Sequence, residues 1–178
     1  MTTLADTFSS TFREEHRLVR DGLLELLDAF ENRDQAKARR VLHEIAVLTG
    51  PHFRYEEEAL YPGLVRFFGE SYVEKLYADH DGAIRGAAEL VEIAGKESWS
   101  ARDVERGQAL VRGILPHVSD CDGLSILVER LPDSFIQNIF RVREQSLAAG
   151  LDLITWAKGV RQRAAFAETH QARAALVK

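Results

Sequence analysis

Apolar residues recur every three or four positions along most of the chain, which is the spacing of one buried face of an α-helix. Among the first thirty residues this spacing joins Phe8, Phe12, Val19, Leu23, Leu27 and Phe30. No stretch sustains the strict alternation of apolar and polar residues that a half-buried strand shows. The pattern therefore predicts an all-α protein.

Four long helices are predicted from this periodicity. Their expected ranges are 3–30, 34–68, 71–95 and 101–131. Asn32-Arg33-Asp34 separates the first two, and the other connections are equally short and polar. Short polar connections favour an up-and-down four-helix bundle.

Residues that begin and end helices set these boundaries. Thr3 or Asp6 can cap the first helix. The second helix is expected to bend or break at Gly50-Pro51 and to end near Gly69. Capping-box patterns open the third helix at Ser71–Glu74 and the fourth at Ser100–Asp103.

The helical spacing continues beyond the bundle, through residues 133–178, with Gly150 as a candidate break. One long or two shorter helices are expected there. We predict a single domain in which residues 132–178 form an extension that packs on a bundle made by residues 1–131. The extension is also the candidate surface for a homodimer contact.

Composition narrows the function classes. The chain has 178 residues, a net charge of −5 and no basic block longer than a pair, which argues against a nucleic-acid partner. Its lone cysteine excludes a disulfide framework. No charge-free apolar stretch approaches the roughly 18 residues of a membrane span, and the N-terminus lacks the features of a signal peptide. We therefore expect no membrane partner and a cytoplasmic location.

Four of the six histidines fall one to each predicted helix, on its apolar stripe. They are His16, His52, His80 and His117. A single histidine on an apolar face is more often a core residue with one hydrogen-bond partner than a metal ligand. Four on four helices would find few partners in a bundle core, and a shared cation would satisfy them together. His43 and His170 are interpreted as surface residues.

The spacing of these histidines suggests two metal ions rather than one. His16 precedes His52 by 36 residues, and His80 precedes His117 by 37. A helical hairpin that is used twice would bring two ligand sets face to face.

Carboxylates beside the histidines complete the candidate site. Glu56 follows His52 by four residues and therefore shares its inward face, where a lone carboxylate is costly unless it binds a cation. Glu57 is the alternative.

In the second hairpin the position four after His117 is Cys121. The nearest carboxylates there are Asp120 and Asp122. Ideal helix geometry slightly favours Asp120, and a bend or bulge would reverse that order.

These elements occur in the order His16, His52-Phe-Arg-Tyr-Glu56, His80 and His117-Val-Ser-Asp-Cys-Asp122. The chain resembles, over about residues 5–131, the hemerythrin-like (HHE cation-binding) family of four-helix bundles that hold a non-haem di-iron centre. The resemblance implies two Fe ions, oxo- or hydroxo-bridged, with Glu56 as a bridging carboxylate. The implied ligands are His16, His52, Glu56, His80, His117 and Asp122; the family's His-x-x-x-x-Asp pattern selects Asp122 over Asp120.

Two positions depart from the family. Oxygen-carrying hemerythrins have a second histidine on the third helix, but the positions four before and four after His80 are Leu76 and Ile84. Cys121 stands where many relatives have a glutamate, and it is interpreted as a small core residue or as a thiol near the metal that is open to oxidation. Reversible dioxygen carriage is therefore disfavoured.

The resemblance implies a protein that binds or reacts with dioxygen, hydrogen peroxide or nitric oxide in an oxidative or nitrosative stress response. Peroxide decomposition or another di-iron oxidoreductase activity would make it an enzyme. The alternatives are a non-enzymatic protein for oxygen or iron binding, sensing or storage, and a helical protein with a structural metal. Iron–sulfur repair is disfavoured because no cysteine-rich N-terminal segment is present.

Overall fold

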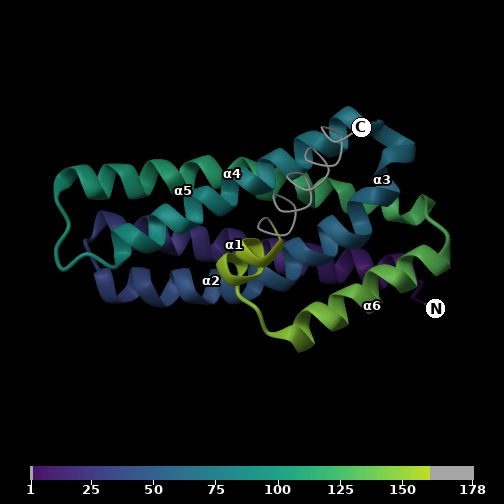
Figure 1. Ribbon diagram of the computed structural model, residues 1–178, viewed down its shortest axis with the longest axis horizontal. Helices are drawn as coiled ribbons and strands as arrows, with labels where there is room; N and C mark the ends of the chain where they lie inside the picture. The colour runs from purple at the N-terminus through teal and green to yellow at the C-terminus, as the bar shows by residue number, and fades with distance from the viewer. Residues whose placement is uncertain (1, 161–178) are drawn as a thin grey trace, which may run out of the picture.

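The computed structural model describes residues 2–160, and every regular element in that range is helical (Figure 1). This confirms the all-α prediction. The elements are α1 (Leu4–Glu31), α2 (Gln35–Tyr55), the π-helix η1 (Glu56–Leu60), α3 (Tyr61–Phe68), α4 (Glu70–Ala94), α5 (Ala101–Asp122), the 3-10 helix η2 (Gly123–Arg130) and α6 (Asp133–Ala149). A last helical segment covers 153–160.

Helices α1, α2, α4 and α5 lie lengthwise beside one another as an elongated bundle, with the α4–α5 connection at the end away from the N-terminus (Figure 1). Helix α6 packs against α1, α2 and η1. Segment 153–160 turns back over α2 and α4, where Leu153, Trp156 and Ala157 are buried against Phe53 and Ala83. The single-domain division at residue 131 stays a prediction.

Two of the predicted helix starts are confirmed and one is wrong. The Thr3 hydroxyl accepts a hydrogen bond from the Asp6 backbone N–H, and the Asp6 carboxylate accepts one from the Thr3 backbone N–H. Ser100 and Asp103 form the same capping box at the start of α5. The predicted box at Ser71–Glu74 does not form, because α4 already begins at Glu70, after Gly69 with φ +80°.

The interruption of the second predicted helix lies elsewhere than expected. Helix α2 stays α-helical through Gly50 and Pro51, and the hydrogen-bond pattern changes only at η1. Gly50 has a different role: a Cβ atom added there would lie 2.2 Å from the carbonyl oxygen of Leu151. The glycine allows the backbone after α6 to cross α2 in contact with it. The end of α3 near Gly69 is confirmed.

The fourth predicted helix consists of two parts, α5 and η2, and it ends before Pro132 as predicted. Beyond it, Gly150 ends α6 in the left-handed conformation, with φ +61°. The Asp152 carboxylate then accepts hydrogen bonds from the backbone N–H groups of Ile154 and Thr155 and caps the next helical segment. The break at Gly150 is confirmed, and residues 161–178 of the predicted extension lie outside the described residues.

The core consists of two large apolar clusters that lie at different heights along the bundle. Phe12 of α1 belongs to one cluster and Val19 of α1 to the other. Between these heights the structure buries polar side chains, including Glu15, His16, His52, Glu56 and His80. The bundle therefore carries a polar layer inside an apolar core. None of the helices in residues 2–160 combines the length and the apolar character that crossing a membrane requires.

Candidate metal centre

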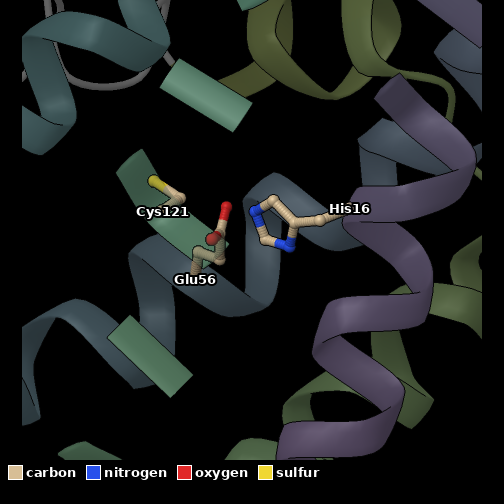
Figure 2. A group of neighbouring side chains, drawn as sticks. All are labelled: His16, Glu56 and Cys121. Carbon is tan, nitrogen blue, oxygen red and sulfur yellow. The ribbon is translucent and has the colours of Figure 1, made fainter. Parts of the chain in front are cut away.

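Three buried side chains from three different elements converge in the polar layer (Figure 2). The Glu56 carboxylate, at the start of η1, points between the His16 ring of α1 and the Cys121 thiol of α5. One ligand atom from each of the three lies within 4.8 Å of the others. This spacing suits donors around a common metal ion.

The carboxylate of Glu56 is the least satisfied polar group of the layer. The Nε2 atoms of His52 and His80 lie 3.4 Å and 3.1 Å from its Oε2 atom. Neither approach has hydrogen-bond geometry, so among the described residues both carboxylate oxygens lack a hydrogen-bond donor. Glu56 is fully buried, and an unsatisfied buried carboxylate costs several kcal/mol unless a cation compensates it.

Three of the histidines are anchored from outside through their Nδ1 atoms. The acceptors are the Phe12 carbonyl for His16 at 2.9 Å, the Glu15 carboxylate for His52 at 2.7 Å and the Glu57 carboxylate for His80 at 3.0 Å. An Nδ1–H group that donates outward leaves Nε2 as the ligand atom, which is the usual arrangement of metal-binding histidines. The anchors therefore fix both the ring orientation and the tautomer.

The charges of the layer are coupled. Burial raises the pKa of Glu56, but the neighbouring His52 and His80 imidazoles outweigh this effect and hold it well below its usual range. Burial lowers the pKa of His52, yet the carboxylates of Glu56 and Glu15 raise it to about 9. A bound cation would take over the role that these imidazoles have toward the carboxylate.

His117 lies at the margin of the layer. Its ring packs edge-on against the His80 ring at a centroid distance of 4.8 Å, and it is only half-buried. A groove of about 390 Å³ between α4 and α5 reaches His117 from the surface. Burial and the charge of His80 lower the pKa of His117 to about 4. Among the four histidines, His117 is the one that is not fully buried.

The two aspartates after His117 have different surroundings. Asp120 is exposed in the groove between α4 and α5. Asp122 has a buried Oδ1 atom without a hydrogen-bond partner among residues 2–160. On a regular helix, Asp122 lies about 55° and Asp120 about 145° from the centre of the buried face of α5. The sequence-based comparison measured both aspartates from His117, which is itself at the edge of that face, and the choice between Asp120 and Asp122 stays a prediction.

The structure adds neighbours that the sequence argument did not assign. The Tyr61 hydroxyl lies 2.8 Å from His80 Nε2 and 3.7 Å from the Cys121 sulfur. Tyr61 follows His52 by nine residues, which is the opposite face of a regular helix, and the π-helix η1 shifts that register. Cys121, four residues after His117, is buried and lies beside His16 and Glu56, so it has features of both interpretations that the sequence allowed for it. Burial raises the pKa of its thiol.

Glu15 was also missed, although it directly precedes His16. Burial raises the pKa of Glu15, but the hydrogen bond from His52 and further partners lower it to about 2. His43 is exposed on α2, as expected, and His170 lies outside the described residues.

One family model matches the chain: hemerythrin HHE cation binding domain, over residues 7–124. The matched range contains every member of the polar layer described above, whereas α6 lies beyond it. No curated protein and no solved structure matches the chain.

Proposed function

The chain belongs to the hemerythrin HHE cation-binding domain family, and on that premise we propose that it is a non-haem di-iron protein that binds or reacts with dioxygen, hydrogen peroxide or nitric oxide. Cation binding is the property of the family. The pair of irons, their ligands and their reactivity are the proposal. The proposed ligands are His16, His52, Glu56, His80, His117 and Asp122.

The unsatisfied carboxylate of Glu56 carries this proposal. Its two oxygens are buried without a hydrogen-bond donor among the described residues, and imidazole nitrogens of two helices lie within 3.4 Å of one of them. A carboxylate with two free oxygens can bridge two cations. Imidazole together with carboxylate is a donor set that suits iron, and the residues present therefore fit the group that the family implies.

The protein's own contribution is to hold these donors in place. Two irons held by imidazole and carboxylate, with an open coordination position, supply the binding and activation of small oxygen or nitrogen species. The anchored Nδ1 atoms keep the Nε2 atoms of His16, His52 and His80 directed inward. The apolar clusters above and below exclude water from Glu56 and so strengthen its attraction for a cation.

The second carboxylate in this proposal is Asp122. The observation in its favour is the buried, unpartnered Oδ1 atom, whereas Asp120 is exposed. Leu76, at a position where a hemerythrin would offer a further histidine, belongs to the apolar core. One iron would then have fewer histidine ligands and more room, which favours reaction with peroxide or a diatomic gas over reversible carriage.

A non-enzymatic protein that binds oxygen or iron for sensing or storage is the alternative for the same centre. The iron-loaded protein is mixed with increasing multiples of hydrogen peroxide, and the released dioxygen is measured with an electrode. Evolution of many equivalents per protein indicates an enzyme, and no more than one equivalent indicates the alternative. Isolation as a colourless zinc protein that does not take up iron would contradict both.

A further inference from the structure

One side chain of α6 reaches the polar layer although α6 lies outside the range that matches the family. The guanidinium of Arg143 donates from Nε and Nη2 to the Oε1 atom of Glu15, at 2.8 Å and 2.6 Å. Arg143 is partly buried and Glu15 is buried. Charge-assisted hydrogen bonds of this length in a poorly solvated place are among the strong ones.

The other oxygen of the same carboxylate faces the centre. Glu15 Oε2 accepts from His52 Nδ1 at 2.7 Å and from the Tyr55 hydroxyl at 2.7 Å. Oε1 of Glu15 thus binds Arg143 of α6, and Oε2 binds His52. Because a carboxylate is rigid and planar, holding Oε1 also fixes the direction of Oε2.

We propose that Arg143 is a positioning residue for the metal centre: it holds Glu15 in the orientation in which Glu15 anchors His52, and so it couples α6 to the site. This inference rests on the proposed function only in taking His52 as a metal ligand. The hydrogen bonds of Arg143 within this network go to Glu15, so it acts on the site through Glu15.

The surroundings explain why the arginine is needed. A surface groove of about 700 Å³ between α1, α2 and α6 is lined by Glu15, His52 and Arg143. Without the guanidinium, the Glu15 carboxylate has room to turn toward water in this groove, where its charge is better solvated. That rotation would leave the Nδ1–H group of His52 without its anchor.

The first test uses the metal-free protein and is independent of the proposed function. Long-range ¹H–¹⁵N spectra are recorded for the full chain and for Arg143→Gln, with Arg141→Gln as the matched control. Arg141 is exposed on the same helix, and its hydrogen bonds among the described residues go to Asn138 and Gln145 of that helix. We expect Arg143→Gln, and not Arg141→Gln, to shift the Nδ1 resonance of His52 and to leave that of His16 in place. An unchanged His52 resonance would overturn the proposal.

The second test asks whether the effect passes through Glu15. Cobalt(II) is loaded as a probe, and its release to a chelator is measured for Glu15→Gln, Arg143→Gln and the double variant. Loss of an outer hydrogen bond to a ligating histidine costs about 10- to 100-fold in metal affinity, so we expect release to accelerate on that scale in each single variant. Arg143→Gln should accelerate cobalt release little further in the Glu15→Gln background. Arg143→Lys, which keeps the positive charge, should release cobalt more slowly than Arg143→Gln.

The outcomes separate this proposal from the proposed function. Equal acceleration by Arg143→Gln in both backgrounds would overturn the coupling through Glu15, whatever the iron chemistry proves to be. A lowered unfolding temperature with unchanged cobalt release and an unchanged His52 resonance would show a merely structural role and would overturn it too. The protein could instead show the expected effects of Arg143→Gln on the His52 resonance and on cobalt release, and yet show no iron reactivity. That result would contradict the proposed function alone.

Discussion

The two halves of the polar layer are built with unequal support. On α1 and α2, His16 and His52 are buried, and their Nδ1 atoms donate to a carbonyl and a carboxylate. On α4 and α5, His80 has a carboxylate anchor, but His117 is only half-buried beside a groove. The His117 ring lies 3.7 Å from the Cys121 sulfur and packs against the rings of Phe53 and His80. The difference separates a half in which both histidines are buried and anchored from a half in which only His80 is.

Each half has a surface groove, so the contrast lies in the histidines themselves. A groove of about 700 Å³ between α1, α2 and α6 is lined by His52, which is buried. A groove of about 390 Å³ between α4 and α5 is lined by His117, which is only half-buried. Under the proposed function, the His117 side is therefore the candidate for exchange with the surroundings.

The largest effect is expected at Glu56, the carboxylate that both halves share. Glu56→Gln removes the negative charge that compensates the cations. Loss of an outer hydrogen bond lowers metal affinity by up to about 100-fold, and loss of this charge should lower the affinity further. The metal content of the purified variant should therefore fall. Glu58→Gln is the matched control, because Glu58 is exposed and bonds to Arg54. Metal analysis after gel filtration measures both, and equal retention by the two variants would show that Glu56 is not a ligand.

The next largest effect on metal content is expected at the histidines, and the experiment compares one histidine from each half. His52→Gly should lose metal more completely than His117→Gly, because His52 is buried and anchored whereas His117 is at the margin. Added imidazole should restore metal binding more readily in His117→Gly than in His52→Gly, because the His117 ring is only half-buried whereas His52 is 3% exposed. His43→Ala, on the exposed side of α2, should leave metal content unchanged. Rescue of His52→Gly alone would reverse the assignment of the two halves.

A smaller effect is expected from the second carboxylate. Asp122→Asn should weaken iron binding in equilibrium competition with a chelator, because its buried Oδ1 atom is the unpartnered one. Asp120→Asn should bind iron as the unchanged protein does. If Asp120→Asn weakens binding and Asp122→Asn does not, the burial argument for this half is wrong.

The smallest effect concerns stability rather than metal binding. It compares one glycine of α2 with one glycine of α5. Gly50→Ala should lower the free energy of unfolding by about 1–3 kcal/mol, since the new methyl group meets the backbone at Leu151 and backbone cannot give way cheaply. Gly113→Ala on α5 meets nothing within 4 Å and should raise it by up to about 1 kcal/mol. Urea denaturation measures both, and a stable Gly50→Ala would contradict the close crossing.

The features that depend on single-helix periodicity could be predicted from the sequence. Helical spacing is enough to place His16, His52 and His80 inside the bundle, because each lies on a long apolar stripe. The capping boxes at Thr3 and Ser100 were also readable, since both partners are three residues apart.

The features that depend on contact between distant segments could not be predicted. Gly50-Pro51 carries a helix-breaking signal, but the glycine is there because the chain crosses at Leu151, a hundred residues away. The anchoring of Glu15 by Arg143 likewise joins residues far apart in the sequence. The π-helix η1 brings Tyr61 toward His80. It covers only five residues, which is too short for its spacing to be recognised in the pattern of apolar residues.

The number of irons that the full chain holds tests the proposed centre most directly. The protein is purified in air, iron per chain is determined by metal analysis, and the ultraviolet–visible spectrum is recorded beside that of Glu56→Gln. We expect two irons per chain, with ligand-to-iron charge-transfer bands that disappear in Glu56→Gln. One iron or a zinc ion per chain, or bands that persist without Glu56, would contradict a bridged pair at this carboxylate.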